Sequence, residues 1–184
     1  ERTGLDSIDI IYVHDLSEEQ VGDRYDYHLI IAKHGAFKVL SDYRSQGIIK
    51  AWGMGVNKVQ AILDCLEVAD PDVCLSATHY SILEHEEAVD RLLPVVRKRG
   101  VRLVSGAAYN SGFVTGRDRY NYKPQIPKGM KEKRDRIAAI AKNYNIDMIT
   151  ASIHFVLAED EYVSIIPGMR KPEQVADNIH ERNT

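Results

Sequence analysis

The segment IDIIYVHDL, residues 8–16, places two polar side chains, His14 and Asp15, after an apolar run. A run of this kind is typical of a β-strand that is covered on both faces. A histidine at the end of such a strand can donate a hydrogen bond to a carbonyl oxygen, with its tautomer fixed by the other ring nitrogen. The alternative for His14 is a structural histidine that finishes the strand. Asp15 is equally well explained as a pocket residue or as a cap for the next segment.

Four further apolar segments also end on residues that are polar, small or both. Because the carboxyl ends of parallel strands share one edge of an α/β fold, binding sites gather at that edge. The segment ends together therefore predict one common rim. The four further ends are GMGVN (53–57), ATHY (77–80), SGAAYNSGF (105–113) and IIPGMRKPEQVADN (165–178).

The last of these ends is a short basic loop that opens onto a helix. Free backbone N–H groups and the positive end of the helix dipole favour an anion at a helix start. Arg170 and Lys171 can add charge-assisted hydrogen bonds to a phosphate. Three polar side chains at helical spacing can contact the edge of an adenine, namely Gln174, Asp177 and Asn178. The alternative is a solvated, charged helix start.

The end of the fourth segment also suits a planar ligand. Tyr109 can stack on an aromatic ring. Asn110, Ser111 and Gly112 after it would let backbone and side chains approach a ligand closely. The alternative is a core tyrosine followed by a turn.

A long irregular stretch, residues 107–129, separates this loop from the next helix. A loop of that length is usually functional, or a lid. Within it, we interpret the group Tyr120, Tyr122 and Pro124 as a packed loop rather than a site. The basic segment 128–136 is interpreted as a solvated helix face rather than a nucleic-acid patch.

The placement of these residues depends on two alternating patterns. Short β-branched runs predict strands, and the segments of helical period between them predict helices. Alternating strands and helices predict a parallel sheet with right-handed crossovers, either an open sheet or part of a closed barrel. The expected strands are 8–14, 49–53, 73–77, 101–105 and 163–167, and the expected helices are 27–46, 58–69, 86–99, 131–144, 148–158 and one from residue 172.

The chain of 184 residues has a formal charge of -3 and 44% hydrophobic residues, which predicts a single globular domain over residues 1–184. The balanced charge argues against nucleic acid as a partner, and no apolar run approaches the roughly 20 residues of a membrane span. Cys65 and Cys74 are expected to be packed, reduced thiols of a cytoplasmic protein. We expect no metal, because neither cysteine belongs to a CxxC motif and the histidines are scattered.

The ordered set of segment ends resembles the aldo-keto reductase family, and within it the bacterial branch of fucose or D-threo-aldose dehydrogenases and pyridoxal dehydrogenase. The matching motifs run in the family's order and cover almost the whole chain. They are IDIIYVHD, QGIIKAWGMGVN, ATHYSILEHE, LLPVVRKRGVRLVSGAAYNSGFVTG and SIIPGMRKPEQVADN.

The resemblance implies an α/β fold, the (β/α)8 TIM barrel, with NAD or NADP extended across its carboxyl-terminal face. The five expected strands look like the fourth to eighth strands of that barrel, so we expect the chain to be the C-terminal portion of a longer protein. The implied activity is hydride transfer between nicotinamide and the carbonyl or lactol carbon of an aldose or small aldehyde. The family's catalytic Tyr, Lys and Asp come from early strands, and no residue here matches their motifs.

The resemblance also assigns roles to single residues. It implies that His14 orients the carbonyl, and Asp15 beside it would suit a hydroxyl-rich substrate. Tyr109 matches the residue that stacks on the nicotinamide. The remaining cofactor residues are Asn57 near the carboxamide, Asn110, Ser111, Gly112 and Phe113 in the pyrophosphate loop, Gly168, Met169 and Arg170 at the adenosine phosphate, and Gln174, Asp177 and Asn178 at the adenine.

The chain departs from the family's pattern at three places. Gly55-Val56 stands where many members carry Ser-Asn, and Ala77 stands where many carry Gln, so the usual carboxamide contacts are altered. Gln174 stands where NADP-specific members often place an Arg, which leans toward NAD. Arg170 and Lys171 can still hold a 2′-phosphate.

Two readings of the resemblance remain open. The first is an enzyme whose partner is a small carbonyl or sugar substrate, with a homo-oligomer as one possible assembly. The alternative is a non-catalytic NAD(P)-binding regulatory subunit of the same fold, similar to the channel-associated members of the superfamily.

Overall fold

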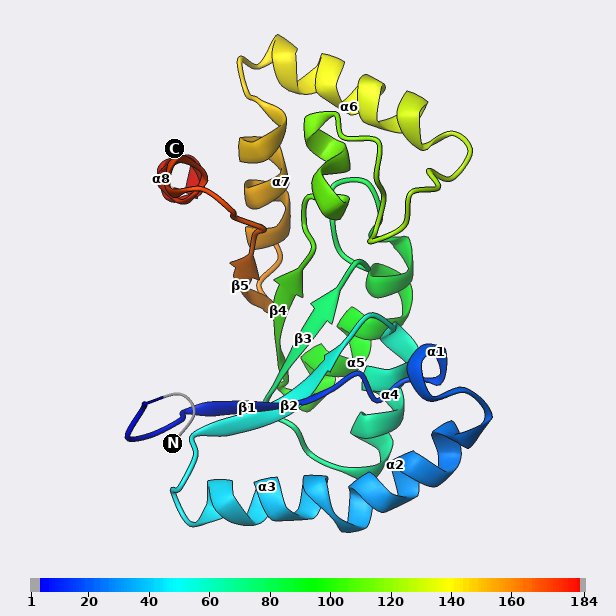
Figure 1. The fold of residues 1–184 in the computed structure, drawn as a ribbon, viewed down its shortest axis with the longest axis vertical. Helices are drawn as coiled ribbons and strands as arrows, with labels where there is room; N and C mark the ends of the chain where they lie inside the picture. The colour runs from blue at the N-terminus through cyan, green and yellow to red at the C-terminus, as the bar shows by residue number, and fades with distance from the viewer. Residues whose placement is uncertain (1–3, 183–184) are drawn as a thin grey trace.

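A five-stranded parallel sheet forms the centre of the protein (Figure 1). The computed structural model describes residues 4–182. The strands follow one another across the sheet in chain order, and every neighbouring pair is parallel. This order lacks the reversal of a doubly wound sheet and is the order of consecutive strands in a barrel. The strands are β1 (Ile10–His14), β2 (Ala51–Val56), β3 (Val73–Ala77), β4 (Arg102–Gly106) and β5 (Tyr162–Ile166).

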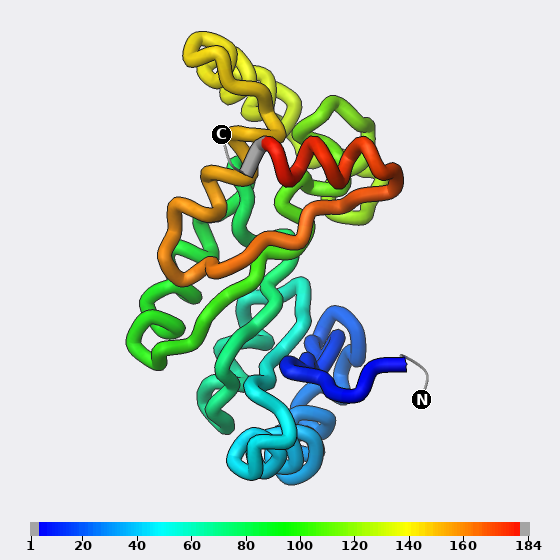
Figure 2. The backbone as a smooth tube through the Cα atoms, turned by 90° about the vertical axis from the view of Figure 1, so that its left-hand side faces the viewer, coloured from blue at the N-terminus to red at the C-terminus, as the bar shows by residue number. Residues whose placement is uncertain are grey.

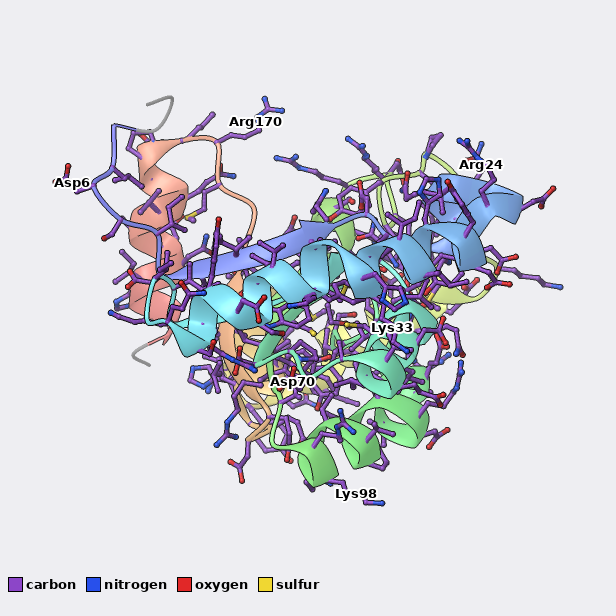
Figure 3. The ribbon with its side chains drawn as sticks, turned by 90° about the horizontal axis from the view of Figure 1, so that it is seen from below. Asp6, Arg24, Lys33, Asp70, Lys98 and Arg170 are labelled. Atoms are coloured by element: carbon purple, nitrogen blue, oxygen red, sulfur yellow. The ribbon has the colours of Figure 1, made fainter. Side chains whose placement is uncertain are left out.

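Helices connect the strands and cover the sheet. Figure 2 shows α8 at the same end of the molecule as α6, remote from α2 and α3. Charged side chains such as Arg24, Lys98 and Arg170 lie at the periphery (Figure 3). The helices are α1 (Glu18–Val21), α2 (Tyr25–His34), α3 (Ala36–Ser45), α4 (Val59–Val68), α5 (Leu93–Arg99), α6 (Met130–Asn143), α7 (Met148–Leu157) and α8 (Pro172–Arg182), with the short 3-10 helices η1 (Gly22–Arg24) and η3 (Asn110–Thr115) and the π-helical segment η2 (Ala88–Leu92).

The largest buried side chain is Trp52 of β2, which packs beneath α3. Its ring stacks on that of Phe37 with centroids 5.3 Å apart. Ile62 of α4 and Leu103 of β4 are also fully buried in the same core cluster. Burial of such side chains is the main source of fold stability, and it fixes the sheet against its helices.

The single helix expected over 27–46 is wrong, because Gly35 divides it into α2 and α3. Gly35 has φ -110 and ψ -97, and its amide donates to the carbonyl of Ile31 at 2.8 Å. A Cβ at this position would lie 2.9 Å from the same Ile31 oxygen. Glycine alone tolerates this close approach, so the break is local and its position is fixed by the sequence. The helix expected over 86–99 is confirmed, and it contains the π-helical segment η2 directly before α5.

Gly53 of β2 lies against the backbone of the neighbouring strand. A Cβ at Gly53 would overlap the carbonyl oxygen of Val73 and lie 2.7 Å from its carbonyl carbon. We predict that Gly53→Ala lowers the free energy of unfolding by about 3 kcal/mol or more, because a backbone atom cannot move aside as a side chain can. Urea denaturation of both proteins checks this.

Gly55→Ala on the same strand is the matched control. Its Cβ would meet the His14 side chain at 3.3 Å and Tyr12 Cβ at 3.5 Å, and side chains can adjust. Equal losses for the two variants would contradict the account of Gly53.

An ion-pair cluster joins the end of α5 to the segment before β5. Arg97 Nε donates to Glu161 Oε1 at 2.7 Å, and Arg97 Nη2 donates to Glu161 Oε2 at 2.9 Å and to Glu159 Oε1 at 2.8 Å. The hydrogen bonds from Arg97 lower the pKa of the nearly buried Glu161 carboxyl to about 2. The paired charge therefore stabilises the fold at every pH at which the Glu161 carboxyl would be ionised in the unfolded chain.

Because the folded pKa of Glu161 lies below its ordinary value of 4.5, this stability is present above pH 4.5 and is lost as the pH falls toward about 2. We predict that Glu161→Gln lowers the free energy of unfolding at pH 7 by about 1 kcal/mol, since water screens the half-exposed Arg97. The difference from the wild type shrinks below pH 4. Denaturation curves at several pH values test this, with Glu67→Gln, an exposed carboxyl, as the control. A constant difference at all pH values would contradict it.

Candidate functional site

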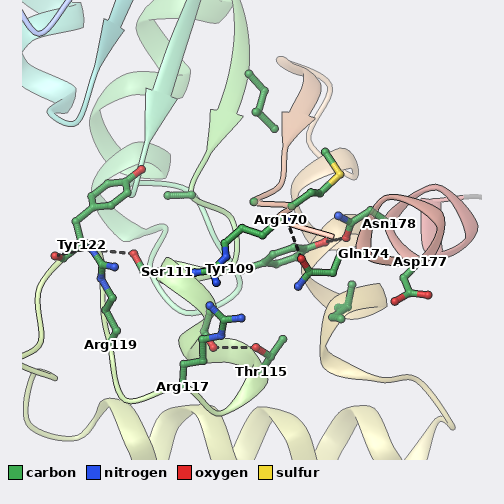
Figure 4. A pocket seen from close by; sticks show the side chains of 16 residues that line it. Tyr109, Ser111, Thr115, Arg117, Arg119, Tyr122, Arg170, Gln174, Asp177 and Asn178 are labelled. Atoms are coloured by element: carbon green, nitrogen blue, oxygen red, sulfur yellow. Dashed lines mark hydrogen bonds between the residues drawn. The ribbon is translucent and has the colours of Figure 1, made fainter. Parts of the chain in front are cut away.

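A cavity of about 480 Å³ lies beside the carboxyl ends of β4 and β5 (Figure 4). One wall is the loop that follows β4, and the other is the loop after β5 with the first turns of α8. The two walls are far apart in sequence and meet because β4 and β5 are parallel neighbours. The cavity therefore lies on the rim that the strand ends predict.

The loop after β4 has an unusual backbone. Asn110, Ser111 and Gly112 are three consecutive residues with left-handed φ values of 46, 62 and 88. Non-glycine residues rarely adopt this conformation, and it persists where the surroundings hold it. A Cβ at Gly112 would also lie 2.6 Å from Arg117 Cδ, so glycine lets Arg117 pack against this turn.

Left-handed residues also mark other strand ends on this edge of the sheet. Asp15 has φ 58 directly after β1, Thr78 has φ 70 directly after β3, and Ala107 has φ 57 directly after β4. Such strained positions cluster at functional edges of folds, because the chain must turn sharply there while presenting side chains.

Of the residues expected in the pyrophosphate loop, only Ser111 and Gly112 line the cavity. Asn110 is fully buried, and its Nδ2 donates to Asn121 Oδ1 at 3.0 Å. Phe113 is also fully buried and packs edge-to-face on Tyr120 with centroids 5.4 Å apart. The expectation that Asn110 and Phe113 face a cofactor is corrected for their side chains. These side chains do not line the cavity and instead pack beneath the loop.

Three guanidinium groups line the cavity, from Arg117, Arg119 and Arg170. Over residues 4–182, none of the three forms an ion pair. Asp177 is the only carboxylate among the lining residues, so the cavity has an excess of positive charge. Arginine is the side chain best suited to phosphate oxygens, and the arrangement therefore fits a phosphorylated anion.

Sequence reasoning missed Arg117 and Arg119. Both belong to the segment GRDRYNY, residues 116–122, within the long irregular stretch after the fourth strand. The signal that could have found them is a pair of basic residues directly after a glycine-rich loop already expected to bind phosphate.

The start of α8 is less open to anions than expected. Gln174 Oε1 accepts hydrogen bonds from the backbone N–H groups of Arg170 at 2.8 Å and Lys171 at 3.1 Å. These two donors of the loop before α8 are therefore occupied by Gln174, whereas the sequence predicts the anion site at the free N–H groups of the helix start. The guanidinium of Arg170 still faces the cavity, whereas Lys171 does not line it.

Tyr109 connects the two walls. Its hydroxyl donates to Asn178 Oδ1 at 2.6 Å, which links the loop after β4 to the second turn of α8. Both residues line the cavity, together with Gly168, Met169, Gln174 and Asp177. The structure thus brings together the residues expected at the nicotinamide, the adenosine phosphate and the adenine.

His14 and Asp15 lie at the same edge of the sheet but do not line the cavity. His14 Nδ1 is 3.3 Å from Asp15 Oδ2, and the His14 side chain is 75% exposed. Asn57 also lies outside the cavity, and its carbonyl oxygen accepts a hydrogen bond from His79 Nε2 at 2.6 Å. The expected contact of Asn57 with a carboxamide stays a prediction.

The interpretation of the tyrosines in the long loop is correct for Tyr120, which is buried, and wrong for Tyr122. Tyr122 lines the cavity and is 52% exposed. Partial burial raises the pKa of its phenol, the Arg119 guanidinium lowers it, and the Asp15 carboxylate raises it. Tyr122 is thus electrostatically coupled to the cavity on one side and to the end of β1 on the other.

Within residues 4–182, no three or more His, Cys, Asp and Glu side chains are grouped so that they could hold a metal ion. The same part of the chain contains no helix with the length and apolar character needed to cross a membrane. The position of the cavity at the strand ends and its three arginines are what make it the candidate binding site.

Comparison with protein families shows that the model for the Aldo/keto reductase family matches residues 1–184. The pyridoxal 4-dehydrogenase of Microbacterium luteolum is 34% identical over 184 residues, which cover 97% of this chain and 53% of that protein. The D-threo-aldose 1-dehydrogenase of a Pseudomonas species is 32% identical over 183 residues, which cover 97% of this chain and 53% of that protein. The chain thus spans about half the length of the curated relatives it matches.

Solved structures share the fold. An aldo-keto reductase from Bacillus halodurans in its apo form has a TM-score of 0.71 at 17% identity, with 100% of this chain and 59% of that chain covered. An aldo/keto reductase from Klebsiella pneumoniae in complex with NADP and acetate has a TM-score of 0.66 at 16% identity. The match covers 100% of this chain and 56% of that chain. The sheet described above is accordingly part of a TIM barrel.

The unpaired arginines predict that the cavity binds a multivalent anion in a salt-dependent manner. We expect inorganic pyrophosphate to bind the wild-type protein and to bind Arg117→Gln/Arg170→Gln at least about tenfold more weakly, because each arginine contributes charge-assisted hydrogen bonds. Isothermal titration calorimetry at two salt concentrations measures this. Arg136→Gln, an exposed arginine of α6, is the control, and equal affinity in the double variant would refute the assignment.

Proposed function

The chain belongs to the aldo/keto reductase family, and on this premise we propose that the protein is an NAD(P)-dependent oxidoreductase. It transfers a hydride between nicotinamide and the carbonyl or lactol carbon of an aldose or small aldehyde. The two dehydrogenases named above support the proposal, since one is named for an aldose and the other for the aldehyde pyridoxal.

The observation that carries the proposal is the arginine-lined cavity at the carboxyl edge of a parallel sheet. NAD and NADP each present an anionic pyrophosphate between two planar ring systems. Arg117, Arg119 and the turn at Ser111 and Gly112 suit the pyrophosphate. The Tyr109 ring suits the nicotinamide. The Klebsiella pneumoniae relative, which was solved with NADP, supports a dinucleotide as the ligand of this fold.

The other end of the cavity suits the adenosine. Gly168, Met169 and Arg170 would lie at its phosphate, and Gln174, Asp177 and Asn178 would lie at its adenine. Gln174 is held by its hydrogen bonds to the amides of Arg170 and Lys171, so it offers its amide nitrogen to a ligand rather than its oxygen. A preference for NAD over NADP stays a prediction, and Arg170 would be the residue that holds a 2′-phosphate.

The nicotinamide would accept the hydride when the substrate is oxidised and donate it when the substrate is reduced, and the residues of this chain orient the two reactants. A ring N–H of His14 would donate to the substrate carbonyl, and the Asp15 carboxylate would accept hydrogen bonds from substrate hydroxyl groups. His14 and Asp15 are accessible at the edge that also carries the cavity. Besides burial, the charges of Arg119 and Asp15 both act on the pKa of Tyr122, a lining residue of the cavity. The proposed substrate position is therefore beside Tyr122, at the end of β1.

A non-catalytic NAD(P)-binding subunit is the second candidate. It is favoured by one observation, namely that the cavity is formed without His14, Asp15 or Asn57. Such a protein would bind the dinucleotide through the same arginines and show no turnover.

The intact gene product distinguishes the two candidates. We expect it to bind NADPH or NADH, followed by fluorescence of the reduced nicotinamide, and to oxidise D-threo-aldoses or pyridoxal with NAD+ or NADP+ as the hydride acceptor. His14→Gln should lower kcat by about a hundredfold and leave the cofactor Kd unchanged, because the carbonyl loses its hydrogen-bond donor.

His34→Gln on the exposed surface of α2 is the matched control and should leave both constants unchanged. Binding without turnover of any aldose or aldehyde would favour the non-catalytic subunit. Absence of dinucleotide binding, or full turnover in His14→Gln, would contradict the proposed mechanism.

A further inference from the structure

A tight turn forms part of the cavity wall and needs outside support. Tyr120 and Lys123 form an isolated antiparallel bridge, with the Tyr120 amide donating to the Lys123 oxygen at 2.9 Å and the Lys123 amide donating to the Tyr120 oxygen at 2.8 Å. Between them, Asn121 has φ 42 and Tyr122 has φ 70. A bulky residue such as tyrosine rarely adopts a left-handed φ unless its surroundings hold it there.

Glu84 supplies that support from another part of the fold. Its Oε2 accepts a hydrogen bond from the Tyr120 hydroxyl at 2.6 Å and a second from Asn121 Nδ2 at 3.0 Å. Burial and the hydrogen bond to Glu84 raise the pKa of Tyr120, so its hydroxyl keeps the proton that it donates. Hydrogen bonds to a carboxylate are stronger than those between neutral groups.

Glu84 is itself fixed to the segment after β3. The Glu84 amide donates to the Ser81 oxygen at 3.2 Å and to Ser81 Oγ at 3.1 Å, and the Ser81 amide donates to the Glu84 oxygen at 2.8 Å. The neighbouring Leu83 is fully buried in a cluster that includes Phe113 and Tyr120. The Glu84 carboxylate is therefore anchored to a rigid turn after β3. Its hydrogen bonds fix the turn Tyr120–Lys123 relative to that strand.

The hydrogen bonds continue from the turn to the left-handed loop after β4. Asn121 Oδ1 accepts from Asn110 Nδ2 at 3.0 Å, and Ser111 Oγ accepts from the Tyr122 amide at 2.7 Å. Figure 4 shows the second of these bonds at the edge of the cavity. The two strained segments thus hold each other, and Glu84 is the charged group at the end of the chain of bonds.

We propose that Glu84 is a positioning residue that holds the turn Tyr120–Lys123, and with it Tyr122 and Arg119, in the geometry that receives the dinucleotide. The inference rests on the proposed function, because it assigns the turn to the dinucleotide cavity. Arg119 Nη2 donates to the Tyr122 oxygen at 3.2 Å, so a displaced turn also displaces this arginine. Glu84 does not line the cavity and acts only through the turn.

The test compares Glu84→Ala with Glu84→Gln in the intact gene product. Alanine removes both hydrogen bonds, whereas glutamine keeps one oxygen that can accept both donors. We expect the Kd for NADPH to rise about tenfold in Glu84→Ala and less than about threefold in Glu84→Gln. Hydrogen exchange of the amides in residues 120–123 should accelerate in Glu84→Ala and be restored in Glu84→Gln.

Glu86→Ala is the matched control, because Glu86 is a nearby acidic residue that pairs with Lys133 at 2.9 Å. It should change neither the Kd nor the exchange of the turn. If Glu84→Ala does not fold, Asn121→Ala removes one of the two hydrogen bonds to Glu84 together with the bond from Asn110, and it should also raise the Kd.

An unchanged Kd and unchanged exchange in Glu84→Ala would overturn the proposal, as would equal effects of alanine and glutamine. Wild-type protein that bound neither NADPH nor NADH would overturn the proposed function. In that case the exchange of residues 120–123 would still decide whether Glu84 holds the turn.

Discussion

The parallel pairing of β1 to β5 in chain order is the constraint on which the rest of the structure depends. Because every strand runs the same way, all five carboxyl ends reach one edge, and each loop after a strand begins there. The loop after β4 and the first turns of α8 meet for this reason, although more than 50 residues separate Tyr109 from Asn178, which share a hydrogen bond. A site of convergent side chains follows from topology alone.

The loops at this edge adopt conformations that isolated chains avoid. Left-handed residues follow β1, β3 and β4, and two further groups of them lie in the long loop. Their strain is offset by hydrogen bonds that run from Glu84 through Asn121 to Asn110 and by the buried contact of Phe113 with Tyr120. The rigid sheet and its first turns thereby fix loops that have little regular structure.

The placement of charge separates the cavity from the rest of the surface. Arg44 pairs with Asp70 and Asp72. Arg97 pairs with Glu159 and Glu161. These two arginines therefore stabilise the fold. The guanidiniums that line the cavity have no carboxylate partner within residues 4–182 and are held beside backbone turns. An unpaired cation in such a position is available to an anionic ligand, which is the physical basis of the proposed dinucleotide site.

The sequence by itself determined the alternation of strands and helices, the common rim and the family, because apolar periodicity and short motifs are local. It also predicted that Tyr109, Gly168 and Asn178 lie on one rim, and these three residues line the same cavity. Tertiary structure alone decided that Gln174 accepts hydrogen bonds from the amides of Arg170 and Lys171, just before α8, and that Asn110 and Phe113 are buried rather than lining the cavity. It alone brought Arg119 and Tyr122 to the cavity wall, because hydrogen bonds between distant segments, which no local pattern encodes, set the course of that loop.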